Sequence, residues 1–105
     1  MSNNAALSLL GIARRAGKLQ AGFLQCESAI KSGKAALALS CSDISPQTEK
    51  ELKFLCGKHN VAHISADFTL AELTGAIGVK AGLCAVCDKG FADRLSAMLT
   101  VKREG

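Results

Sequence analysis

Helical and strand-like hydrophobic patterns alternate along the chain, and single glycines or short polar turns separate them. Apolar residues at helical spacing predict five amphipathic helices, and four shorter apolar segments predict strands. The predicted helices run from Asn3 or Asn4 to Gly17, from Gly22 to Gly33, from Ser45 to Asn60, from Thr69 to Gly78 and from Asp88 onward, and the predicted strands cover 18–21, 35–40, 61–65 and 83–87.

Local signals define several of these helix ends. Ser45 stands directly before Pro46; serine is a preferred N-cap, and proline is accepted at the first helical position because no N–H is needed there. Thr69 and Glu72 have the spacing of a capping box. Asn60 tolerates the left-handed conformation that often ends a helix. We therefore expect sharply defined helix boundaries at these positions.

The fold class follows from the alternation. Strands that alternate with helices, joined by links of only a few residues, favour helices packed on both faces of one sheet. The strands at 35–40, 61–65 and 83–87 are nearly continuous apolar runs, as expected for a sheet covered on both faces. We predict an α/β fold, a three-layer α/β/α sandwich, formed by a single domain spanning residues 1–105.

Length and composition agree with this interpretation. A chain of 105 residues has room for one core, and 49% hydrophobic with 21% charged residues is an ordinary globular balance. No apolar run reaches the ~18 residues needed to cross a bilayer. Arg14 and Arg15 follow the first apolar stretch, which is the reverse of the order in a signal peptide. We expect a cytoplasmic protein with no membrane partner.

The net charge of +4 is unevenly distributed. Residues 1–35 contain five basic side chains against Glu27 alone, whereas residues 36–105 contain equal numbers of basic and acidic side chains. A basic region in an otherwise neutral domain points to a polyanionic partner, although surface lysines also serve only to solvate a protein. Trp and Tyr are absent and the four Phe are expected in the core. RNA would therefore be read by shape, phosphates and hydrogen bonds rather than by aromatic stacking.

Cysteine spacing raises the question of a metal or redox site. Cys84 and Cys87 form a CxxC, but both lie in the predicted strand 83–87, where residues three apart point to opposite faces. The remaining cysteines form no second CxxC that would complete a tetrahedral zinc site. We therefore expect buried, reduced cysteines and no metal.

Catalytic motifs are not recognisable either. Gly11 to Lys18 differs from a phosphate-binding loop because five residues separate its glycines and Leu19 replaces the metal-binding Ser or Thr. His59 and His63 are four apart, but His63 lies in a predicted strand, so they do not share a helical face. We expect neither an enzyme nor a cofactor.

Three separated segments, 9–18 (LLGIARRAGK), 29–34 (AIKSGK) and 88–92 (DKGFA), give the sequence a family resemblance. From about Ala6 to Leu95 it resembles the bacterial YlxQ group of ribosomal-protein-like RNA binders. These proteins are relatives of the large-subunit ribosomal proteins L-seven-Ae (L7Ae) and L-thirty-e (L30e). The resemblance implies a four-stranded mixed sheet and binding to kink-turn RNA, a sharply bent internal loop with tandem sheared G·A pairs.

In that family the start of the second helix enters the RNA with a Gly-x-Asn-Glu-x-x-Lys stretch. The matching stretch here begins at Gly22, but Leu24 replaces Asn, Gln25 replaces Glu and Ser28 replaces Lys. Gln25 and Ser28 can still form hydrogen bonds, whereas Leu24 cannot. A lost buried polar contact costs ~1–3 kcal/mol, so affinity for a standard kink-turn is expected to fall.

Two loops resemble further parts of the family's RNA face. One contains Asp43 and Ile44 and resembles an Asp-Val-x-Pro turn; in the other, 79–82, relatives pack an apolar residue against an extruded base. The predicted RNA-binding residues are Lys18, Gly22, Leu24, Gln25, Ser28, Lys31, Lys34, Asp43, Ile44, Val79, Lys80 and Ala81.

The leading hypothesis is a ribosomal-type protein that binds structured RNA, such as a kink-turn in rRNA or an mRNA leader, with the ribosome as a further partner. The alternative is a ribosome- or translation-associated protein–protein interaction module in which kink-turn recognition has weakened. In that case Leu24, exposed at a helix start, would anchor a protein partner.

Overall fold

The structure, a computed structural model, describes residues 3–100. Within this range five helices and four strands follow one another in the order α1 (Asn3–Arg15), β1 (Leu19–Ala21), α2 (Phe23–Lys31), β2 (Leu37–Ser40), α3 (Pro46–Lys58), β3 (Ala62–Ser65), α4 (Leu70–Ile77), β4 (Leu83–Val86) and α5 (Lys89–Thr100). Every predicted element is present, and the strand boundaries differ from the predicted ones by at most two residues. None of the helices in this range is long and apolar enough to span a membrane.

The four strands form one mixed sheet in the order β1-β4-β2-β3. β4 runs antiparallel to both β1 and β2, whereas β2 and β3 are parallel. Ala21 pairs with Cys84 and Ser40 pairs with Leu83. The last residues of β1 and β2 therefore lie beside the first residues of β4, and the segments attached to them meet at one end of the sheet.

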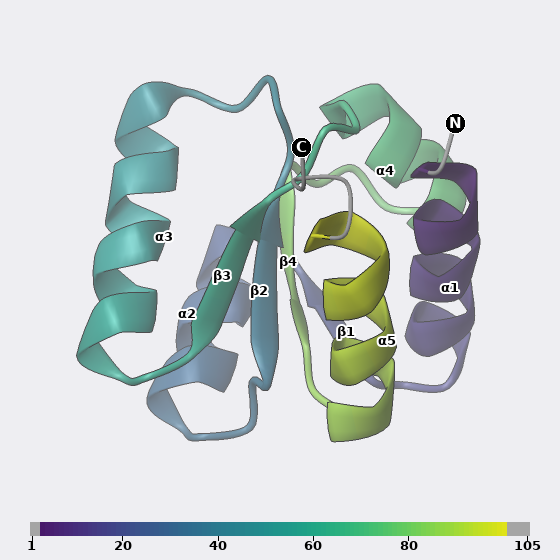
Figure 1. Cartoon of the computed structure of the whole chain (residues 1–105). Helices are drawn as coiled ribbons and strands as arrows, with labels where there is room; N and C mark the ends of the chain where they lie inside the picture. Colours follow the sequence, from purple (N-terminus) through teal and green to yellow (C-terminus); the bar gives the residue numbers. More distant parts are fainter. Residues whose placement is uncertain (1–2, 101–105) are drawn as a thin grey trace.

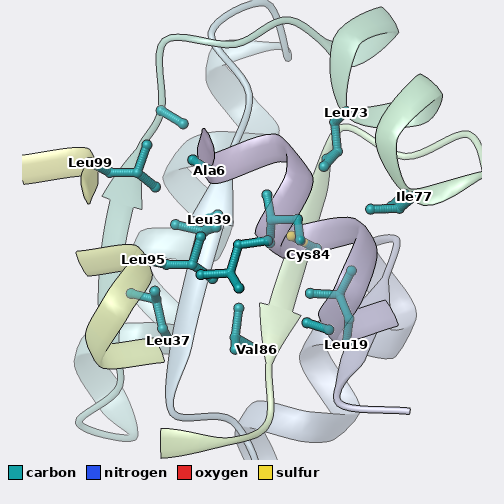
Figure 2. Packing of buried hydrophobic residues seen from close by; sticks show 14 of the residues in the cluster. Ala6, Leu19, Leu37, Leu39, Leu73, Ile77, Cys84, Val86, Leu95 and Leu99 are labelled. Carbon is teal, nitrogen blue, oxygen red and sulfur yellow. The ribbon is translucent and has the colours of Figure 1, made fainter. Parts of the chain in front are cut away.

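Helices cover both faces of the sheet, which confirms the predicted α/β/α sandwich. Figure 1 shows α2 and α3 on one side and α1, α4 and α5 on the other. Side chains alternate between two cores: Leu37 and Leu39 face α1, α4 and α5, whereas Ala38 faces α2 and α3. Figure 2 shows Leu39 packed with Leu95 of α5 in the first core. Because helices cover both faces of the sheet, every residue of β2 and β4 is buried.

The helix-end signals are confirmed by the hydrogen bonds. Ser45 Oγ accepts from the Thr48 N–H at 3.1 Å, and Asp88 Oδ2 accepts from the Phe91 N–H at 2.9 Å. Both hydrogen bonds of the capping box at the start of α4 are present. Asn60 has the left-handed φ of 58°.

Three sequence predictions need correction. The strand β3 is half-exposed rather than covered on both faces, because it is an edge strand: its two middle residues are half-buried and its two end residues are exposed. Phe54 is 68% exposed on α3, although all four Phe were expected in the core; Phe68 alone among them is fully buried. Asn3 and Asn4 both lie within α1, so neither is its N-cap, and the residue before Asn3 is outside the described range.

Candidate nucleic-acid interface

Three segments far apart in the sequence meet at the end of the sheet where α2 begins. The Gly22 N–H donates to the carbonyl oxygen of Leu83 at 3.1 Å, and the Cys41 N–H donates to the carbonyl oxygen of Gly82 at 2.9 Å. These bonds join the start of α2, the loop after β2 and the loop before β4. The α4 helix and the β2–α3 loop are at this end, the top of the view in Figure 1.

The backbone conformation at Gly22 determines how α2 begins. Its φ of 98° and ψ of 158° suit glycine and strain other residues. No side chain caps the helix start. The N–H groups of Phe23, Leu24 and Gln25 have no acceptor within the helix because they belong to its first turn. With the positive end of the helix dipole, they make this helix start suited to an anion such as phosphate.

The side chains around this helix start are exposed. Leu24 is 73% exposed, the largest exposed fraction among the large hydrophobic side chains in the described range. The amide oxygen of Gln25 folds over Gly22, 2.9 Å from where a Cβ on that glycine would lie. Ser28 follows one turn later and is also exposed. The surface therefore offers an amide, a hydroxyl and an apolar side chain, and no charged group, at residues 24, 25 and 28.

A polar groove of about 400 Å³ continues from this helix start along α2. Its lining comprises Gly17, Gln20, Gln25, Ser28, Ala29, Ser32, Lys34 and Cys87. Gln20, Ser32 and Cys87 were missed by sequence reasoning. Ser32 lies one helical turn after Ser28, a spacing that could have identified it. Gln20 and Cys87 reach the groove through the pairing of β1 with β4, which the sequence does not reveal.

The predicted basic residues do not surround the start of α2. The Lys18 carbonyl oxygen accepts from the Cys87 N–H at 2.8 Å, which places Lys18 at the opposite end of the sheet from Gly22. Lys34 lines the far part of the groove, and the exposed Lys31 forms an ion pair with the half-buried Glu27 at 3.2 Å. The nine residues of α2 span only ~13 Å, so one RNA helix could reach both ends.

The loop after β2 is held in place by internal contacts. Asp43 Oδ1 accepts from the Leu70 N–H at 2.8 Å and so satisfies a free donor at the start of α4. Ile44 is half-buried and packs against both cores. A methyl group added to Gly82 would lie 2.5 Å from Cγ2 of Ile44, so the loops before β4 and after β2 are in tight contact. Both predicted residues of this loop have structural roles.

The loop before β4 presents less surface than the sequence predicts. Lys80 is exposed and Val79 is half-buried against the core formed with α1, α4 and α5. Ala81 is only 6% exposed, and its N–H donates to Thr74 Oγ1 at 3.4 Å. The side chain of Ala81 is therefore not available to a partner, whereas those of Lys80 and part of Val79 are.

The CxxC cysteines diverge as predicted. Cys84 is fully buried in the core formed with α1, α4 and α5, and Cys87 packs, half-buried, against the opposite core. Burial raises the pKa of Cys84 well above 9.0 and also raises that of Cys87, which the nearby Lys34 and Lys18 partly oppose. These thiols therefore stay protonated at neutral pH. Within residues 3–100, no three His, Cys, Asp or Glu side chains gather as metal ligands would.

Comparison with known proteins gives a consistent result. The sequence profile of the ribosomal protein L7Ae/L30e/S12e/Gadd45 family matches residues 4–96. A protein of Enterococcus faecium named RNA-binding protein YlxQ is 31% identical over 94 residues, covering 90% of this chain and 90% of its own length. A protein of the same name in Bacillus subtilis (strain 168) is 34% identical over 92 residues, covering 87% of this chain and 91% of its own.

Solved structures agree with the fold. A protein of unknown function from Bacillus halodurans C superposes with a TM-score of 0.82 at 33% identity, covering 89% of this chain and 94% of its own. The 15.5kD RNA binding protein of Giardia lamblia superposes with a TM-score of 0.76 at 15% identity, covering 92% of this chain and 83% of its own. At that low identity the second likeness bears on the fold alone.

Proposed function

Because the chain belongs to the ribosomal protein L7Ae/L30e/S12e/Gadd45 family, we propose that it binds structured RNA with the start of α2 and the two loops beside it. Two relatives that match most of the chain are named RNA-binding proteins, which supports this proposal. The same names support the expectation that the chain is not an enzyme.

The observation that carries the proposal is the meeting of three sequence-distant segments around an uncapped helix start. Gly22, Cys41 and Leu83 belong to three different segments, and backbone hydrogen bonds hold these segments together. The free N–H groups at residues 23–25 can bind a phosphate, and Gln25 and Ser28 can bond to base edges or sugars. Lys80 on one side and Lys34 along the groove add positive charge for the RNA backbone.

The RNA that we propose is a kink-turn or a similarly bent helix, in rRNA or an mRNA leader, because the family resemblance implies such an RNA. The ribosome is the larger assembly in which it would be found. Leu24 replaces a polar reading group, so the contact at that position is apolar. The missing hydrogen bond would weaken binding to a standard kink-turn by ~1–3 kcal/mol, or about 5- to 150-fold.

Gel-shift titrations would test the proposal directly. The full chain is titrated against a kink-turn RNA and against a control in which Watson–Crick pairs replace the tandem G·A pairs. We expect the kink-turn to bind more tightly. Leu24→Asn, which restores the family's polar group, should strengthen kink-turn binding by about 5-fold or more. Equal affinity for both RNAs would contradict kink-turn recognition, and binding to neither would contradict RNA binding at this site.

The exposure of Leu24 favours one second candidate, a ribosome- or translation-associated protein interaction module. A leucine that is 73% exposed at a helix start can anchor a protein partner. The same Leu24→Asn variant separates the candidates, because it should weaken a protein complex anchored by Leu24 while strengthening binding to the kink-turn.

A further inference from the structure

An apolar groove of about 520 Å³ lies between α2 and α3, apart from the polar groove described above. Its lining comprises Phe23, Glu27, Gln47, Lys50, Glu51, Phe54 and Leu55. Phe54 is 68% exposed although it is one of the largest apolar side chains in the protein. Single exposed apolar side chains are common, but here three apolar side chains line one concave surface together.

The charges around this groove differ from those of the chain as a whole. Glu27 of α2 and Glu51 of α3 stand on opposite walls, with Lys50 as the one cation in the lining, whereas the chain carries a net charge of +4. Glu51 accepts a hydrogen bond from Gln47 at 3.1 Å, and Lys31 pairs with the half-buried Glu27 at 3.2 Å. The Lys31 side chain itself is 56% exposed, so a cation of a partner can compete with it for Glu27.

We propose that the α2–α3 groove binds a basic amphipathic segment of a partner protein, with an apolar side chain of the segment against Phe54 and its Lys or Arg side chains beside Glu27 and Glu51. The exposed aromatic ring supplies the apolar anchor site, and the two carboxylates determine the sign of the partner.

RNA and a second copy of this chain fit this groove less well. Lys50 and Lys31 only balance the charges of Glu27 and Glu51, so the groove has no excess of positive charge to attract phosphates. A symmetric second copy would add an equal set of charges and so would bring no excess of cations to the carboxylates. A basic protein segment can cover the apolar floor and also supply cations to both carboxylates.

This groove adjoins the proposed RNA surface but differs from it in most of its residues. Phe23 belongs to both, with its N–H at the RNA surface and its side chain in the groove. Leu24, Gln25 and Ser28 are not part of the lining, and neither is any residue of the loops after β2 and before β4. The proposal therefore adds a second partner, of a different class, to an RNA-binding protein. One molecule could hold RNA at the start of α2 and a protein segment between α2 and α3 at the same time.

A peptide selection tests the proposal. A phage-displayed library of random 16-residue peptides is selected on the immobilised full chain, after depletion on the Phe54→Ala variant. We expect the selected peptides to carry an excess of Lys and Arg beside at least one large apolar residue. A synthetic copy of one such peptide should shift the NMR amide signals of Glu27, Glu51 and Leu55.

Variants and controls keep the outcome clear. Phe54→Ala should weaken peptide binding about tenfold or more, and Glu51→Lys should weaken it similarly. Ile12→Ala removes another exposed apolar side chain, on α1, and should leave it unchanged. Because Phe54 is exposed, its replacement should preserve both the melting temperature and the affinity for RNA. A failure of the peptide-binding proposal can therefore be told apart from a failure of the proposed RNA function.

Four results would overturn the proposal. If the selected peptides are acidic, the proposed basic character of the partner is wrong. If they bind the Phe54→Ala variant as tightly as the original chain, the site is not the α2–α3 groove. A selection that yields no binder would contradict a peptide site. Sedimentation that shows a dimer lost in Phe54→Ala would assign the groove to a second copy instead.

Discussion

Replacing Gly82 by alanine should test how closely the two loops of the RNA-binding end are coupled. Gly82 lies just before β4, and an added methyl group would be 2.5 Å from Cγ2 of Ile44 and 3.3 Å from Cδ1 of Leu70. Carbon atoms in ordinary contact are about 3.5–4.0 Å apart, so the first contact would be roughly 1 Å too short. Ile44 is half-buried between both cores and has little room to move.

The cost follows from these distances. Overpacking by one methyl group typically costs ~1–3 kcal/mol, and the reduced chain entropy of alanine returns ~0.4–1 kcal/mol. We expect Gly82→Ala to lower the free energy of unfolding by about 1–2 kcal/mol, or the melting temperature by roughly 5–10 °C. Thermal melts followed by circular dichroism measure this. RNA affinity should fall as well, because the loops after β2 and before β4 must separate.

Two comparisons make the prediction specific. Gly75 lies within α4 with open space around it, so Gly75→Ala should stabilise the protein by ~0.5–1 kcal/mol. In an Ile44→Ala background the nearest remaining atom of that side chain would be its Cβ, 3.9 Å from the new methyl group. Adding Gly82→Ala there should cost little. The same destabilisation by Gly82→Ala in both backgrounds, or none in the original chain, would refute the proposed contact.

Two further predictions concern charge and pH. If Lys34 contacts a phosphate, Lys34→Gln should reduce the steepness of the plot of log RNA affinity against log salt concentration by roughly one unit. Lys89→Gln, on α5, is the control and should leave the slope unchanged. Equal slopes for the two variants would show that Lys34 is not part of the RNA interface. Burial lowers the pKa of His63, as does Lys53, while Glu49 opposes the shift. The unfolded chain therefore binds the proton more readily, and stability should decline as pH falls below about 6.5. Urea unfolding of His63→Gln should show a flatter pH dependence over this range, and an unchanged profile would exclude His63 as the source.

Helix ends were predictable because their signals are local. Ser45, Thr69 with Glu72, and Asp88 each bond to a backbone N–H a few residues away, and the structure contains those bonds. The strands were located for a similar reason, since their apolar runs reflect burial of adjacent residues.

The features that depend on strand order were not predictable from periodicity. The sequence pattern does not reveal that β3 is an edge strand, so its apolar residues appeared fully covered. The exposure of Phe54 likewise depends on how α3 sits against α2. Gln20 and Cys87 line the polar groove only because β1 pairs with β4.

The sequence prediction named segments that the structure brings together, but it also named side chains that are not available at the surface. The segments at 22–28, 43–44 and 79–81 do meet at one end of the sheet, as the resemblance implied. Asp43 caps α4 and Ala81 is buried, because the loops need internal contacts to hold their shape. Lys18 and Gly22 are close in sequence but lie at opposite ends of the sheet, because the strand β1 runs between them.

The central claim is that structured RNA binds at the start of α2 and the loops beside it. Its most direct test is an NMR titration of the full chain with a kink-turn RNA, following the backbone amide signals. The largest changes are predicted for residues 22–28, 41–44 and 79–82, with smaller changes along the polar groove. Changes confined to α1 and α5, or no changes at all, would contradict the claim.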